Sequence, residues 1–407
     1  MSNYLIKEFI LVYLITSIVI NLPNVQSSIM FYFKTILIFL IGILFVIKIY
    51  SNKNLEFFYK NSGSLLTLCL LAAFFYNFLT LTPPSFLLFS IIFIIFFVFF
   101  GRNIGVENLK LGLFSTISLI LINLLLLRVC LSGLFEIFNH NYYINDLSLE
   151  LKNIGYNVGR TGWAISVIFL ICFLKIFKRQ LSNNSKIKNI LLSSTITLGS
   201  ICVFLSDSRT GIIALLILLI IWNYEFFNKF IKPKFIFYLF LAFEILIILI
   251  GIASIISVLE NTRLATFNSG DDISNGRFEG TLIGLEIIKN NFIMGTYPIK
   301  PYDLKDYGMA YSEIHVLWLN LMALYGVPLI TFIIFSLMYL IIRSVRFYYR
   351  GKVRYNNLDS KTFIFLVVFG LFVSFFEPNG IISFISFVAI YWFTLGLCFN
   401  IKSSRNV

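Results

Sequence analysis

Two arginines and a histidine in the second half of the chain have residue types and positions suited to an anionic substrate. The clearest signal is the turn SDSRTG at 206–211, which joins two long apolar runs with almost no loop. Asp207 or Ser208 can cap the following helix by accepting hydrogen bonds from its first backbone amides. Arg209 and Thr210 then lie in the first turn, where the helix dipole disfavours a cation by about 1 kcal/mol or less. Such an arginine is understandable if phosphate binds there, since helix-start amides and guanidinium groups both bind phosphate.

The other two candidates are Arg277, which follows an Asn-Gly pair at the start of a predicted helix, and His315, which lies where a long apolar run begins. Tyr311 shares the face of His315 if the helix extends that far back, whereas Glu313 points elsewhere. Each candidate also has a simpler interpretation. Arg209 could reach lipid headgroups, and His315 could pair with a backbone carbonyl at the interface. Arg277 could be a solvated loop arginine, and for it the two interpretations stay open.

Membrane helices must position these residues, because the composition excludes a water-soluble protein. The chain has 407 residues, of which 59% are hydrophobic and 13% charged, and its mean hydropathy is +0.90. About twelve apolar runs approach or exceed the roughly 20 residues that cross a bilayer. The predicted spans are 5–22, 29–48, 63–81, 85–101, 111–133, 161–178, 189–206, 208–224, 235–258, 314–341, 362–377 and 380–399. We therefore expect an all-α polytopic integral membrane protein with one transmembrane domain over residues 1–407.

The placement of lysine and arginine predicts the orientation of the chain. These residues accumulate on the cytoplasmic side of membrane proteins, and here every second connection is basic. The basic connections lie at 7, 48–60, 102–110, 175–188, 229–234, 343–361 and 402–405. This pattern places both termini in the cytoplasm, and it makes the formal net charge of +13 a sign of topology rather than of nucleic-acid binding. Lys7 before an apolar run also resembles a signal peptide, but no convincing small-residue cleavage site follows, so we expect a retained helix.

Two predicted outer connections are long, at about 134–160 and about 259–313, and loops of that length are usually functional or disordered. The second is expected to contain a helix near 276–291, with Glu279 and Glu286 on one stripe and Leu285 and Ile288 opposite. Such a helix would lie at the membrane surface or cover a cavity. The five cysteines fall in or at the ends of spans, with no metal-ligand spacing, so no disulfide framework is expected.

The order of these pieces resembles the bacterial O-antigen ligase and polymerase superfamily of membrane glycosyltransferases. The resemblance rests on the SRTG turn at 208–211, the Gly-Arg helix start at 276–277, the segment 291–295 and the stretch 315–326. It implies a polytopic enzyme that acts on undecaprenyl-diphosphate-linked glycans at the outer face of the bacterial cytoplasmic (inner) membrane, without nucleotide sugar, cofactor or metal. Relatives often have His-Asn where this chain has His315-Val316, so a role for that asparagine has no counterpart here.

By motif match, Arg209, Arg277 and His315 occupy the superfamily's functional positions, and Arg160 ends a loosely similar segment at 155–160. Arginines can neutralise the charge that grows on a departing diphosphate. A histidine suits base catalysis near neutral pH, and it could equally donate a hydrogen bond to the diphosphate. The further candidate bases are Asp207, Glu313 and Glu377. The expected substrate-binding residues are Arg160, Asp207, Ser208, Thr210, Tyr311 and Glu313.

Three functions stay open, of which we favour a polymerase that transfers a growing lipid-linked polysaccharide onto another lipid-linked repeat unit. A ligase or protein O-oligosaccharyltransferase would use the same donor with lipid A core or a protein hydroxyl as acceptor. A transporter of lipid-linked glycans should carry charged groups along its interior path, whereas Glu244 is the only clear acid in the middle of a predicted span. The expected partners are lipid-linked glycans as donor and acceptor and the lipid bilayer, with a chain-length regulator protein as a further candidate and no nucleic acid.

Overall fold

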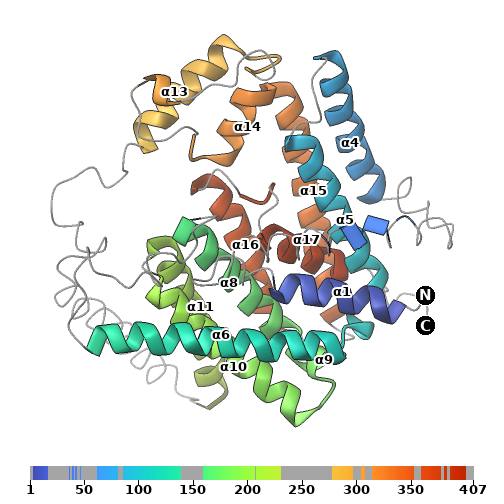
Figure 1. Cartoon of the computed structure of the whole chain (residues 1–407). Helices are drawn as coiled ribbons and strands as arrows, with labels where there is room; N and C mark the ends of the chain where they lie inside the picture. Colours follow the sequence, from blue (N-terminus) through green and yellow to red (C-terminus); the bar gives the residue numbers. More distant parts are fainter. Residues whose placement is uncertain are drawn as a thin grey trace.

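The computed structural model of the chain describes residues 3–16, 62–80, 86–138, 159–206, 208–230, 277–296, 304–307, 314–352, 359–376, 380–382 and 386–399, with a few isolated positions between 36 and 46. Every regular element in these ranges is a helix (Figure 1). In chain order they are α1 (Asn3–Thr16), α4 (Ser62–Leu79), α5 (Phe86–Ile104), η2 (Val106–Asn108), α6 (Leu113–Phe138), α8 (Gly159–Ile176), α9 (Lys178–Ser182), α10 (Lys186–Leu205), α11 (Arg209–Phe230), α13 (Arg277–Asn290), η4 (Leu304–Tyr307), α14 (Leu317–Tyr325), α15 (Val327–Lys352), α16 (Ser360–Phe376) and α17 (Ser386–Cys398). The all-helical expectation is confirmed for this part of the chain.

Four of the described helices are long and apolar enough to cross a membrane, namely α5, most of α6, α10 and most of α15. Shorter apolar helices occur in α4, α8, α11, α16 and α17. Large apolar side chains on these helices are exposed, among them Phe78 at 66% and Phe335 at 70%, and hydrocarbon would cover such a surface. These features indicate a helical membrane protein. The count of twelve spans stays a prediction, because the span expected at 235–258 and most of the one at 29–48 lie outside the described residues.

Helix α8 lies in the interior of the described part of the molecule. Its large side chains Trp163, Phe169 and Phe173 are buried, and it packs against α10, α11, α16 and α17. A helix that is apolar on every side is expected in the middle of a bundle. The directions of the neighbouring helices can therefore be compared with that of α8.

Helices α5 and α17 approach each other closely because glycine lies at their contact. A Cβ added to Gly101 would lie 2.5 Å from the carbonyl oxygen of Phe393, and one added to Gly396 would lie 2.6 Å from that of Val98. Small residues allow such backbone contact between membrane helices. This pair forms the packed side of the bundle next to α1 and α4.

The run at 314–341, predicted as one span, is instead two helices, α14 and α15, which is a correction to the sequence-based prediction. The break is at Gly326, which has a φ of +85°. Only glycine adopts this φ without strain. Pro328 follows in the first turn of α15, where proline is favoured. Because α14 begins at Leu317, His315 lies before the helix rather than within it.

The buried face of α13 also differs from the predicted stripe. Gly280 and Gly284 are turned inward together with Ile288, whereas Leu285 is 47% exposed. The glycine spacing allows the backbone of α13 to approach its neighbour. Helix α13 therefore docks through its small residues and presents part of its apolar surface outward.

Candidate functional site

Helices α8 and α11 lie side by side and run in the same direction. A Cβ on Gly211, the third residue of α11, would lie 2.7 Å from the Cβ of Ala164 near the start of α8. Further along both helices, the Nζ atom of Lys175 lies 5.1 Å from the ring centroid of Trp222. Both helices therefore begin at one end of the bundle.

Helix α16 runs antiparallel to this pair. The indole nitrogen of Trp222 donates a hydrogen bond of 2.8 Å to the hydroxyl of Thr362 at the start of α16. Further along, the rings of Phe169 and Phe369 lie 5.7 Å apart. Helix α16 therefore ends at the level where α8 and α11 begin.

The start of α14 lies at this same end. A Cβ added to Gly380 would lie 2.7 Å from the Cα of Ser374, in the last turns of α16, and 2.8 Å from the Cδ2 of Leu317. Leu317 is the fully buried first residue of α14, and His315 is half-buried two positions before it. The backbone of His315 is thus brought to the end of the bundle where α8 and α11 begin.

Three helix starts at one end provide a favourable setting for an anion. The first amides of a helix lack intrahelical acceptors, and the dipole makes this terminus positive. In α11, the buried Ser208 accepts a hydrogen bond of 3.2 Å from the backbone N–H of Gly211. Ser208 is therefore a cap of α11, and Asp207 lies outside the described residues.

Helix α13 covers the segment that carries His315. A Cβ on Gly284 would meet the Cδ1 atom of Ile314, and Ile314 is buried in a small apolar cluster. The cluster consists of Ile287, Ile288, Leu304, Ile314 and Ala323. Arg277 begins α13 seven residues before Gly284, about 10 Å away along the helix axis at 1.5 Å per residue.

The turn that follows α13 is fixed to the break between α14 and α15 by backbone hydrogen bonds. The N–H of Thr296 donates to the carbonyl of Ala323 at 2.8 Å, and the N–H of Val327 donates to that of Phe292 at 2.9 Å. Tyr76 of α4 donates a hydrogen bond of 2.8 Å to the carbonyl of Met294. Helix α13 therefore has a defined place above the helix starts, and Figure 1 shows α13 and α14 together at the top of the molecule.

The family model described as O-antigen ligase matches residues 194–334, from within α10 to the first turns of α15. Through this region, the chain is similar to the O-antigen ligase family. No curated protein matches the chain.

The O-antigen ligase region contains Arg209, Arg277 and His315, and it places each at or just before a helix start. The side chains of both arginines and of Arg160 lie outside the described residues, as do Asp207, Tyr311, Glu313 and Glu377. Thr210 is partly buried in the first turn of α11. Within the described ranges, no three side chains of His, Cys, Asp or Glu form a group that could hold a metal ion. The convergence of the two guanidinium groups and the imidazole stays a prediction.

The contact of α4 with the turn that follows α13 was not predicted from the sequence. Tyr76 reaches Met294 across 218 positions of sequence, and its ring lies edge-on against that of Tyr325, with centroids 5.6 Å apart. No local pattern predicts such a pair. The glycines at 280 and 284 were a readable signal for close packing of α13.

Proposed function

We propose that the chain is a polymerase that extends a polysaccharide from undecaprenyl-diphosphate-linked repeat units at the outer face of the bacterial cytoplasmic membrane. The observation that carries this proposal is the O-antigen ligase match over 194–334, which contains Arg209, Arg277 and His315. The gathering of three helix starts at one end supports it, since a diphosphate donor is a multiply charged anion.

The reaction transfers a glycosyl group. The bond between the anomeric carbon of the growing chain and its diphosphate oxygen breaks, and the diphosphate leaves with the bonding electrons. A hydroxyl of the incoming lipid-linked repeat unit forms the new bond to that carbon and gives up its proton. The site must therefore stabilise the negative charge on the departing oxygen and accept the proton of the attacking hydroxyl.

Arg209 and Arg277 suit the departing oxygen. Cations held in place before the reaction stabilise developing negative charge by several kcal/mol in a dry site. Each arginine begins a helix, so the backbone amides of the same turn can bind the other phosphate oxygens. His315 suits the attacking hydroxyl as a base, with Asp207, Glu313 and Glu377 as alternatives, or it donates a hydrogen bond to the diphosphate.

A ligase is the second candidate, and the description of the matching family favours it. Ligase and polymerase share the donor and the leaving group, and they differ only in the acceptor. A protein O-oligosaccharyltransferase belongs to the same alternative with a protein hydroxyl as acceptor. None of these differences changes the roles proposed for the arginines.

The lipid-linked intermediates of a strain that lacks the chain distinguish the two activities. A missing polymerase leaves single repeat units on undecaprenyl diphosphate, whereas a missing ligase leaves full-length lipid-linked chains. We expect single units, which restoring the wild-type chain converts to polymer. Full-length chains on the lipid would replace the polymerase proposal by the ligase, and unchanged intermediates would overturn both.

A further inference from the structure

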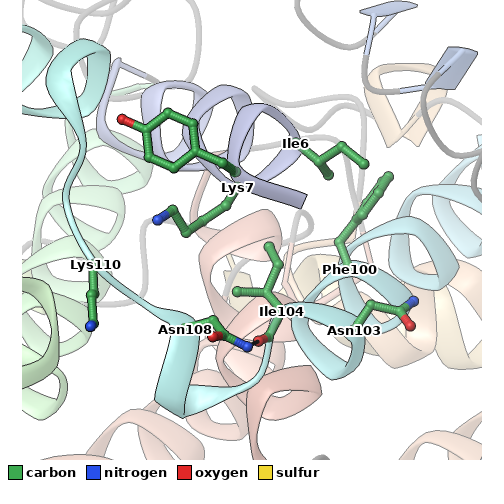
Figure 2. Close-up of a pocket in the computed structure, with 8 residues that line it drawn as sticks. Ile6, Lys7, Phe100, Asn103, Ile104, Asn108 and Lys110 are labelled. Carbon is green, nitrogen blue, oxygen red and sulfur yellow. Dashed lines mark hydrogen bonds between the residues drawn. The ribbon is translucent and has the colours of Figure 1, made fainter. Parts of the chain in front are cut away.

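A basic cavity lies at the end of the molecule away from the candidate catalytic residues. Its volume is about 280 Å³, and Figure 2 shows it between the first turns of α1 and the end of α5 with the η2 turn. The lining consists of Tyr4, Ile6, Lys7, Phe100, Asn103, Ile104, Asn108 and Lys110. The lining thus combines two ammonium groups and two amides with an apolar wall.

The cavity is distant from the proposed active site because it belongs to the other end of α8. The backbone N–H of Leu111, next to the cavity, donates to the carbonyl of Leu181 in α9 at 3.0 Å, and α9 follows the end of α8. At 1.5 Å per residue, the 18 residues of α8 separate its two ends by about 27 Å. That length is close to the thickness of the hydrocarbon core of a bilayer.

Lys7 is the charged group at the centre of this cavity. It is only 7% exposed, and its Nζ lies 4.8 Å from the centroid of the Tyr4 ring. Figure 2 shows its side chain extending from α1 into the space between α1 and the η2 turn. A buried ammonium is costly without an anionic partner.

The neighbouring carboxylate, Glu8, is shared between Lys7 and the start of α6. Glu8 is 1% exposed and accepts hydrogen bonds from the N–H groups of Gly112 and Ser115 and from the Ser115 hydroxyl, at 2.9, 3.1 and 3.0 Å. It therefore caps the start of α6. Lys110 lines the same cavity, and Lys188 donates to the Leu111 carbonyl close by, so positive charge exceeds negative charge here.

We propose that this cavity binds the phosphate of an anionic phospholipid headgroup in the leaflet opposite the candidate active site. The proposal rests on the chain spanning the membrane, and it is independent of whether the chain acts as polymerase or ligase. The ammonium groups of Lys7 and Lys110 pair with the phosphate, and the apolar wall of Ile6, Phe100 and Ile104 receives the first part of an acyl chain. Free phosphate would pair with the same two ammonium groups but would not contact the apolar wall.

Native mass spectrometry of the full chain in a neutral detergent tests the proposal. We compare retention of phosphatidylglycerol with that of phosphatidylcholine for the wild type, Lys7→Met and Lys110→Met. Methionine removes the charge and keeps most of the volume. The exposed Lys186, at the start of α10 on the same side, provides the control Lys186→Met.

We expect the wild type and Lys186→Met to retain phosphatidylglycerol about tenfold better than phosphatidylcholine, and both cavity variants to lose most of this preference. Lys110 is exposed, so Lys110→Met keeps the test valid if Lys7→Met does not fold. Equal retention by wild type and both cavity variants would overturn the proposal. Release of the lipid by millimolar inorganic phosphate would overturn the lipid assignment and show a site for free phosphate instead.

Discussion

At the residue scale, glycines decide where the candidate site can form. Gly295 and Gly326 both have positive φ, at +69° and +85°, and both lie where the turn after α13 meets the end of α14. A Cβ on Gly326 would collide with the carbonyl oxygen of Ile293, and one on Gly295 would collide with that of Leu324. Backbone is touching backbone at this junction, and neither side has a flexible group that could move aside.

The substitution Gly326→Ala is expected to destabilise the protein by more than about 1 kcal/mol, because alanine is strained at positive φ and its methyl group must displace the backbone of Ile293. Gly199→Ala is the matched control. Its Cβ would lie 3.1 Å from the end of the Ile171 side chain, and alanine favours a helix interior. Thermal unfolding in detergent measures both. A Gly326→Ala variant as stable as Gly199→Ala would contradict the described junction.

At the element scale, the site depends on helix directions that hydropathy alone does not give. The apolar runs predicted most helices, since α4, α5, α6, α8, α10, α11, α16 and α17 all lie within or around predicted spans. The break at Gly326 was missed because apolar residues continue across it, although glycine followed by Pro328 is a helix-stop and helix-start signal. The fixed position of α13 was not predictable, because it depends on Tyr76 and on backbone contacts between segments far apart in sequence.

The pairing of α6 with α10 has a direct chemical test. The Sγ atoms of Cys130 and Cys202 lie 3.4 Å apart, and both side chains are buried. A membrane-permeant oxidant such as diamide should therefore join them, because a disulfide needs only a small further approach. Mass spectrometry of non-reduced peptides should find the 130–202 link in the wild type and lose it in Cys202→Ser. Links that instead involve Cys172 or Cys398 would show that α6 and α10 pack differently.

At the scale of the whole molecule, the two ends of α8 carry different chemistry. One end gathers the starts of α8, α11 and α14 beneath α13, and the other gathers lysines from α1, the η2 region, α9 and α10. The predicted sidedness gives the first end to the outer face and the second to the cytoplasm. On this account, catalysis and a lipid-headgroup contact occupy opposite leaflets of one helical domain.

Cysteine labelling tests this sidedness. A single cysteine replacing exposed Lys305 in η4 should react with a membrane-impermeant maleimide in intact cells or spheroplasts, whereas one replacing Lys186 should react only after the membrane is opened. Both positions are exposed, so access to the reagent is decided by the membrane. The reverse labelling pattern would place the candidate site on the cytoplasmic side and contradict the proposed function.

The most direct test of the central claim is polymer formation by purified chain with lipid-linked repeat units, measured for Arg209→Ala, Arg277→Ala, His315→Ala and the double variant Arg209→Ala with His315→Ala. Each single change should lower the rate by about 10²-fold or more, and the double variant should lose little further activity, because residues of one site act as a unit. Arg346→Ala, in the second half of α15, is the control and should keep its activity. Normal polymer from the three single variants, or losses that simply add in the double variant, would contradict a shared site.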